Sequence, residues 1–234
     1  MHIAFFDSGL GGLSIVHAFF SHPKAHLVNI KQCSYIADTG AFPYGDKNDS
    51  WLVERIVKTI RAAINLLQPD LIVIACNTAS TLALARLRCE FCIPFIGVVP
   101  AIKPAVEASK TGVIGVLATP ATVARDYTSQ LINNYAPKQS VLLHGCSQLV
   151  AQAERCMLDL PVDTDAVGLS LKALLQQQGG ANIDTIVLAC THFPLLKPVL
   201  QNELAKLQAK PVMWVDSGEA IARRIIQLTT RSLT

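Results

Sequence analysis

The sequence predicts an α/β protein with two similar parallel-sheet α/β domains and an active site in the cleft between them. Three observations lead to this fold class. Short apolar runs recur along the chain, and helical patterns lie between most of them. One apolar run, together with the Ala-Cys and the polar residues that follow it, occurs twice. Parallel strands that are buried on both faces have continuous apolar sequences, and strands that alternate with helices indicate parallel sheets.

The apolar runs mark the expected strands, and helices are expected between them. The strands are expected at residues 2–6, 33–37, 70–75, 95–99, 112–118, 140–145, 184–189 and 212–215. Apolar side chains at helical spacing predict helices over residues 50–68, 81–91, 165–180 and 192–208.

The repeated run indicates two halves of similar design. DLIVIACNTAS, which contains Cys76, and DTIVLACTHFP, which contains Cys190, place their cysteines 114 residues apart in a chain of 234 residues. Because ligands of open α/β sheets bind beyond the carboxyl ends of the strands, the polar residues after these runs are the first candidates for a site.

The domain boundaries follow from the same repeat. We expect a first domain over 1–97 plus about 209–234, and a second domain over 98–208. The segment 97–112 contains two prolines and is expected to connect the halves. The final strand and helix are too short to stand alone, so they are expected to return to the first domain.

Composition excludes several classes of protein. With 51% hydrophobic and 16% charged residues the chain is typical of a soluble folded protein rather than a disordered one. A net charge of +3 without a basic cluster does not favour nucleic acid, and no apolar run reaches the roughly 18 residues of a membrane span. Seven cysteines without framework spacing favour free thiols in a reducing compartment, so a cytoplasmic location is expected.

Cys76 and Cys190 each lie between a strand and a helical segment, where the positive end of a helix favours a thiolate. Free cysteines are often only small buried apolar residues, which is our interpretation of Cys33, Cys89, Cys92, Cys146 and Cys156. The repeated position favours a function for the other two. A phosphatase loop is excluded because leucine, not arginine, stands six residues after each cysteine. A cysteine hydrolase that uses Cys190 with His192 would leave Cys76 unexplained.

Polar residues follow other expected strands. Asp7 ends the first strand, before a loop in which Ser14 stands where a dinucleotide fingerprint needs its last glycine. Its carboxylate suits proton transfer or an ammonium group, although it could equally be only a helix cap. Further strand-end loops carry Tyr44, Gly45, Thr119 and Thr122, and a helical segment carries Glu154. The histidines lack metal-ligand spacing and no lysine suggests a pyridoxal site, so neither a metal nor a cofactor is expected.

Two opposed thiols suit inversion of a stereocentre. One thiolate would remove a proton from one face of a carbon while the other thiol returns a proton to the opposite face. An amino-acid α-proton is very weakly acidic, so dry surroundings and oriented donors would have to stabilise the carbanion. This chemistry requires that the two halves face each other.

The motifs FDSGLGG, DTGAFPYG, ACNTAS, GVVPAIKPA, LATPAT, LACTHFPLL and VDSGEAIARR resemble, in order and over nearly the whole chain, the glutamate racemases of the cofactor-independent Asp/Glu racemase superfamily. The resemblance implies that Cys76 and Cys190 are the catalytic bases, assisted by Asp7 and His192. It also implies a glutamate site lined by Asp7, Ser8, Tyr44, Gly45, Asn77, Thr78, Thr119, Thr122, Glu154 and Thr191.

The resemblance also implies a substrate and partners. His192 stands where aspartate racemases usually carry a glutamate, which favours L- and D-glutamate and a supply of D-glutamate for peptidoglycan. AFPYG and VVPAIKPA resemble a branch that is often activated by UDP-N-acetylmuramoyl-L-alanine. Racemisation of aspartate or a hydantoin, and a non-catalytic amino-acid-binding module, are the alternatives. The oligomeric state stays open, a homodimer included.

Overall fold

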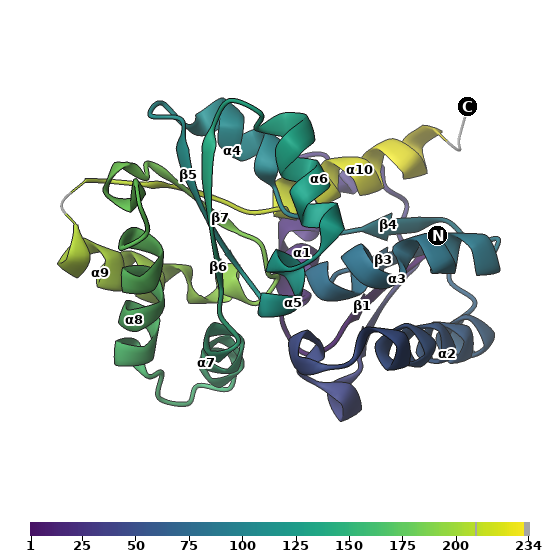
Figure 1. Cartoon of the computed structure of the whole chain (residues 1–234). Helices are drawn as coiled ribbons and strands as arrows, with labels where there is room; N and C mark the ends of the chain where they lie inside the picture. Colours follow the sequence, from purple (N-terminus) through teal and green to yellow (C-terminus); the bar gives the residue numbers. More distant parts are fainter. Residues whose placement is uncertain (209, 232–234) are drawn as a thin grey trace. The chain divides into compact units, whose positions relative to one another are not determined.

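The computed structural model describes residues 1–208 and 210–231, and these residues form two compact units (Figure 1). The first unit takes Met1–Val99 and the segment from Ser217 onward, and the second takes Pro100–Asp216. Each unit contains one four-stranded sheet whose paired strands are all parallel. The expected α/β class with two similar parallel sheets is therefore confirmed.

The first unit is built on a sheet with strand order β2-β1-β3-β4. Its elements are β1 (His2–Asp7), α1 (Leu13–Phe20), η1 (Ala25–Leu27), β2 (Gln32–Ala37), η2 (Thr39–Ala41), η3 (Tyr44–Asp46), α2 (Asp49–Leu67), β3 (Leu71–Ile74), α3 (Asn77–Glu90), β4 (Phe95–Gly97) and α10 (Gly218–Arg231).

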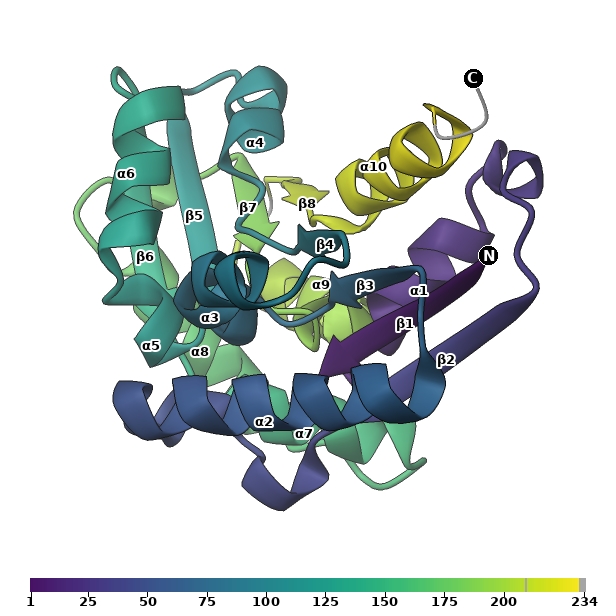
Figure 2. The ribbon, with the colours of Figure 1, turned by 90° about the vertical axis from the view of Figure 1, so that its right-hand side faces the viewer.

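Helices cover both faces of this sheet because its central strands β1 and β3 are buried along their whole length. Ala4 and Phe6 of β1 pack in a buried cluster with residues of α2 and α3. Ile3 and Phe5, which alternate with them, pack in a second cluster with residues of α1 and α10. Figure 2 shows the strands of this sheet between α2 and α10. Alternate side chains of a strand point to opposite faces, and burial of both faces explains the continuous apolar run.

The second unit repeats this plan with strand order β6-β5-β7-β8. Its elements are α4 (Ile102–Ala108), β5 (Val113–Ala118), α5 (Pro120–Val123), α6 (Asp126–Tyr135), β6 (Ser140–Gly145), α7 (Gln148–Met157), α8 (Thr164–Leu175), η4 (Gly180–Asn182), β7 (Thr185–Leu188), η5 (Phe193–Leu196), α9 (Lys197–Leu207) and β8 (Met213–Val215). In Figure 1, α4 and α8 flank its strands on opposite sides.

Each apolar run that was expected to be a strand contains one, but the expected boundary near residue 209 differs from the structure. β8 pairs with β7, so residues 213–215 belong to the second sheet, and the chain returns to the first unit only at Ser217. The Ser217 hydroxyl donates to the Val99 carbonyl at 2.6 Å, which ties this return to the end of the first segment. A strand of three residues needs a partner for its backbone hydrogen bonds, and β8 finds this partner in β7 at the edge of the second sheet.

Two further expectations need correction. The segment expected to connect the halves is not only a linker, because Ile102 and Ala105 of α4 are buried against the second sheet. The helix expected directly after Cys190 begins later, since η5 comes first and α9 starts at Lys197. Within the described residues, no helix is long and apolar enough to cross a membrane.

Candidate active site

Asp7 and Cys76 of the first unit lie at the point where the strand order of the sheet reverses. β1 and β3 are neighbours, and the chain leaves them toward opposite edges of the sheet. Their carboxyl ends therefore flank the kind of crevice in which open α/β sheets bind ligands. Asp7 is the last residue of β1, and Cys76 is the second residue beyond β3.

Cys76 occupies the position that the sequence predicts for a reactive thiol. It is the N-cap residue of α3, a helix of 14 residues, with an extended backbone at φ −143° and ψ 120°. The side chain is 5% exposed, and its Sγ lies 4.0 Å from the hydroxyl of Ser8. The amide groups and dipole at the start of a helix stabilise an anion there.

Asp7 is fully buried, and its two carboxylate oxygens have different surroundings. Oδ2 accepts hydrogen bonds from the amides of Gly9 at 3.2 Å and Gly12 at 3.0 Å. Among the described residues Oδ1 has no hydrogen-bond partner, and the same holds for Oδ1 of Asn77, the residue after Cys76. One oxygen thus orders the loop before α1, as a cap would, and the other remains an acceptor.

Gly12 is needed where this loop passes β1 and β3. A Cβ at this residue would lie 2.8 Å from the Asp7 Cβ, 2.8 Å from the Tyr35 hydroxyl and 3.1 Å from the Ala75 Cβ. The absence of a side chain lets the Gly12 amide reach the Asp7 carboxylate, so the glycine fixes a candidate site residue.

Tyr44 and Gly45 lie in η3, after the end of β2. Tyr44 is 2% exposed, and its hydroxyl donates to Asp38 Oδ2 at 2.7 Å. Burial, followed by the hydrogen bond to the Asp38 carboxylate, raises the pKa of Tyr44 strongly, and nearby negative charge on Cys76 and Asp7 adds to the effect. The phenol therefore stays neutral at physiological pH.

The other expected residues of this unit are also buried. Ser8 is 4%, Asn77 3% and Thr78 3% exposed. Asn77 and Thr78 are the first two residues of α3, directly after Cys76. The structure thus gathers Asp7, Ser8, Tyr44 and the first residues of α3 around one thiol within this unit.

Cys190 occupies in the second unit the place that Cys76 has in the first. It is the second residue beyond β7, is 6% exposed, and has its Sγ 3.8 Å from Nδ1 of His192. Nε2 of His192 lies 2.7 Å from Oε1 of Glu154 on α7. Thr191 and His192 are 3% and 2% exposed. A carboxylate, an imidazole and a thiol therefore stand in hydrogen-bonding sequence.

Thr119 and Thr122 lie at the end of β5, which corresponds to β1 in the strand order. Thr119 caps α5 by accepting from the Thr122 amide at 3.2 Å, and its hydroxyl lies 2.9 Å from the Thr122 hydroxyl. Both side chains are buried. Thr119, Thr122 and Cys190 thus follow β5 and β7, as Asp7 and Cys76 lie at the ends of β1 and β3, while Glu154 comes from α7 and the Tyr44–Gly45 turn follows β2.

Two groups near these residues were not singled out by the sequence. Arg55 of α2 reaches the Asp38 carboxylate with two nitrogens. Cys146, which was interpreted as a buried apolar residue, lies just beyond β6 with its Sγ 3.1 Å from the Ser170 hydroxyl. Burial raises the pKa of Cys146, but hydrogen bonds, led by those from His144 and Ser170, outweigh it and lower the pKa to about 7. Neither contact has a local sequence signal, because the partners are far apart along the chain.

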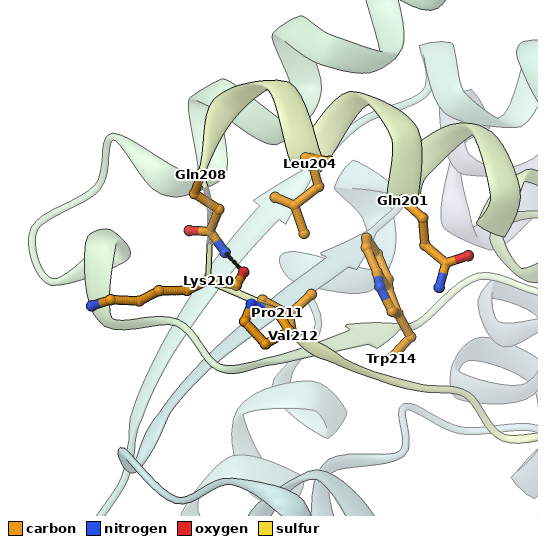
Figure 3. Close-up of a pocket in the computed structure, with 8 residues that line it drawn as sticks. Gln201, Leu204, Gln208, Lys210, Pro211, Val212 and Trp214 are labelled. Carbon is orange, nitrogen blue, oxygen red and sulfur yellow. Dashed lines mark hydrogen bonds between the residues drawn. The ribbon is translucent and has the colours of Figure 1, made fainter.

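A separate pocket of the second unit contains none of the expected residues. It has a volume of about 230 Å³ and is lined by Gln201, Leu204, Ala205, Gln208, Lys210, Pro211, Val212 and Trp214. Figure 3 shows the Leu204 and Trp214 side chains between α9 and the segment that leads into β8. The described lining residues offer apolar surface, two side-chain amides and the ammonium group of Lys210, but no carboxylate, thiol or imidazole.

Two parallel sheets of one strand order, each with a thiol two residues beyond its third strand, define a class of duplicated α/β protein with a cysteine at equivalent strand ends. The profile of the Asp/Glu/Hydantoin racemase family matches residues 18–225. The chain belongs to this family.

Individual relatives agree with this assignment. The chain is 46% identical over 228 residues to a glutamate racemase of Aliivibrio fischeri, covering 97% of this chain and 80% of that protein. It is 44% identical over 227 residues to a glutamate racemase of Sphingopyxis alaskensis, covering 97% and 81%. A crystal structure of Escherichia coli glutamate racemase in complex with L-glutamate and the activator UDP-MurNAc-Ala is similar with a TM-score of 0.86 at 39% identity, covering 97% of this chain and 82% of that one.

Proposed function

We propose that the protein is a cofactor-free racemase that interconverts L- and D-glutamate with Cys76 and Cys190 as its two bases. The observation that carries this proposal is the equivalence of the two thiols, each two residues beyond the third strand of its own sheet. A single-base reaction would need only one of them. Inversion of a carbon needs an acid–base group on each face, which gives the duplication a chemical reason.

The proton transfer balances without a cofactor. One cysteine thiolate takes the α-proton of glutamate and becomes a thiol, which leaves a carbanion that is delocalised into the carboxylate. The thiol of the other cysteine then gives its proton to the opposite face of the same carbon and becomes a thiolate. The reverse reaction exchanges the two roles. The mechanism requires that both thiols reach the same substrate.

The surroundings of Cys76 suit an amino acid. Oδ1 of Asp7 and Oδ1 of Asn77 are buried acceptors that have no partner within the described part of the chain. Buried acceptors are normally satisfied, and the ammonium group of an amino acid supplies three N–H donors. We propose that Asp7 and Asn77 hold this group, and that Ser8, Thr78 and the Tyr44–Gly45 turn contact the same substrate molecule.

In the second unit, His192 is proposed to assist Cys190. Its Nδ1 faces the thiol at 3.8 Å, and its Nε2 contacts Glu154 at 2.7 Å. A carboxylate that hydrogen-bonds one ring nitrogen holds the ring orientation and favours positive charge on the imidazole. The ring is thereby held with Nδ1 toward the Cys190 sulfur, where it can exchange a proton with the thiol. We propose that Thr119, Thr122 and Thr191 supply neutral donors for the substrate carboxylates.

Glutamate is proposed as the substrate because relatives that are 46% and 44% identical to this chain are named glutamate racemases. We propose that the reaction takes place in the cytoplasm and that it supplies D-glutamate for the synthesis of peptidoglycan. The E. coli relative was crystallised with the activator UDP-MurNAc-Ala. We propose the same class of nucleotide-linked activator for this protein.

Incubation of the purified protein with L-glutamate in D₂O tests the proposal. We expect deuterium at Cα by NMR together with decay of the circular dichroism signal of glutamate to zero. L-Aspartate and a hydantoin in parallel samples distinguish the alternative racemases. Absence of both deuteration and optical change, with and without UDP-N-acetylmuramoyl-L-alanine, would overturn the proposal.

A further inference from the structure

An ion pair lies beside the loop that carries Tyr44 and Gly45. Arg55 of α2 donates from Nε to Asp38 Oδ2 at 3.0 Å and from Nη2 to Asp38 Oδ1 at 2.5 Å. The Asp38 side chain is 4% exposed and that of Arg55 39%. Two parallel hydrogen bonds between a guanidinium and a carboxylate fix the orientation as well as the position of the carboxylate.

The same carboxylate also binds the candidate substrate-site tyrosine. Asp38 Oδ2 accepts the Tyr44 hydroxyl at 2.7 Å, and the Asp38 amide donates to the Asp7 carbonyl at 2.9 Å. Asp38 is therefore anchored to the end of β1 by its backbone, to α2 by its carboxylate and to the loop through Tyr44. The hydrogen bonds from Arg55 hold the pKa of Asp38 below its usual value, so it remains a charged acceptor.

Tyr44 in turn lies beside the proposed base of this unit. It belongs to the same buried cluster as Cys76 and Ala79, and its ring centroid is 6.3 Å from that of Phe6. A shift of the Asp38 carboxylate would therefore move a side chain of the buried cluster that contains the thiol. Gly40, within the loop, would place a Cβ 3.5 Å from Arg55 Nη2, so the loop passes close to the guanidinium.

We propose that Arg55 is a positioning residue for substrate binding, which acts through Asp38 to hold Tyr44 and Gly45 in place. Arg55 need not touch substrate itself. This inference rests on the proposed function, because it assumes that the Tyr44–Gly45 turn binds glutamate. It goes beyond that function by assigning a role to a helix residue outside the strand-end loops.

Arg55→Gln tests the inference, with Arg61→Gln as a matched control. Arg61 lies on the same helix and pairs with Glu90, while its guanidinium carbon stands 5.3 Å from the Phe91 ring centroid. Each variant removes one guanidinium of α2 from an ion pair with a carboxylate outside this helix. We expect Arg55→Gln to raise the KM for glutamate about tenfold or more, because small displacements of positioning groups are costly, and to leave kcat within about threefold. Arg61→Gln should leave both constants unchanged.

Arg55→Lys provides a second variant that keeps the charge but not the two-nitrogen fork. It should give a KM between those of the wild type and Arg55→Gln, which a role of charge alone would not produce. An unchanged KM in Arg55→Gln, whatever its thermal stability, would overturn the positioning role, as would equal KM changes in Arg55→Gln and Arg61→Gln.

Hydrogen exchange of the peptide that contains residues 38–46 gives a readout apart from activity. We expect faster exchange there in Arg55→Gln than in the wild type or in Arg61→Gln. If the wild type failed to racemise glutamate, the proposed function would fall, while this measurement would still test whether Arg55 holds the loop. Unchanged exchange in Arg55→Gln would overturn the inference on its own.

Discussion

Cys76 and Cys190 are equivalent in position and unequal in surroundings. Each is the second residue beyond the third strand of its sheet, but the Cys76 Sγ has the Ser8 hydroxyl at 4.0 Å and the Cys190 Sγ has Nδ1 of His192 at 3.8 Å. A helix of 14 residues starts directly after Cys76, while a short turn separates Cys190 from α9. Equal positions fit two bases for one reaction, and unequal neighbours fit an unsymmetrical substrate.

Replacement of either cysteine by serine should nearly abolish racemisation. A serine hydroxyl is a far weaker acid than a thiol, so Cys76→Ser and Cys190→Ser should each lower turnover by about 100-fold or more in both directions. The measurement is circular dichroism started from each enantiomer. Cys89→Ser, at an exposed position, is the control and should retain wild-type rates. A Cys76 or Cys190 variant with wild-type turnover in both directions would contradict the two-base mechanism.

Glu154→Gln should lower kcat more than it raises KM. The amide keeps the size of the side chain but removes the charge that contacts His192, so we expect a loss of about 10- to 100-fold in kcat and an altered pH profile. Glu203→Gln is the matched control, because Glu203 lies in α9 of the same unit and pairs with Lys206 rather than with a candidate residue. Equal pH profiles for Glu154→Gln and the wild type would show that the carboxylate does not tune His192.

Gly12→Ala should destabilise the first unit and impair activity together. The added Cβ would lie 2.8 Å from both the Asp7 Cβ and the Tyr35 hydroxyl, so the loop must shift, at a cost of about 1–3 kcal/mol. Urea unfolding measures the change in free energy of unfolding. Gly168→Ala in α8 is the contrast, because its nearest neighbour would be 3.5 Å away. It should stabilise the protein by about 0.5–1 kcal/mol through helix propensity. Equal effects of the two substitutions would contradict the close approach at Gly12.

Asp184 should make stability depend on pH in the acid range. Burial raises the pKa of Asp184, but hydrogen bonds, led by that from the Ser109 hydroxyl, outweigh it and lower the pKa to about 2. Because the folded-state pKa is the lower one, this stabilisation is present near neutral pH and is lost as pH falls toward about 2. Asp184→Asn should lower the free energy of unfolding at pH 7 by about 1 kcal/mol, after allowance for solvent screening.

Urea unfolding of the wild type and Asp184→Asn between pH 7 and pH 2 checks this prediction. The two curves of stability against pH should converge in acid. Parallel curves would mean that Asp184 does not contribute through its charge.

Much of the fold was predictable from the sequence because its signals are local. A strand that is covered on both faces must be apolar at every position, so β1, β3, β5 and β7 appear as continuous runs. The polar residues directly after these strands were also predictable, because the carboxyl end of a parallel strand marks the edge of the buried core, where ligands of such sheets bind. Cys76 and Cys190 were found by this local signal and by its repetition.

Contacts between distant residues were not predictable in this way. β8 was expected to return to the first domain, but its pairing with β7 depends on complementary sheet edges that no local pattern encodes. The contact of His192 with Glu154 joins residues 38 positions apart, and the Arg55–Asp38 pair spans 17.

The sequence by itself therefore determined the α/β class, the duplication and the two thiols at strand ends, since periodicity and burial act along a few consecutive residues. The tertiary structure alone decided which carboxylate meets His192, which guanidinium holds Asp38 and which oxygen of Asp7 is left as an acceptor. Those outcomes depend on hydrogen-bond geometry between elements that only folding brings together.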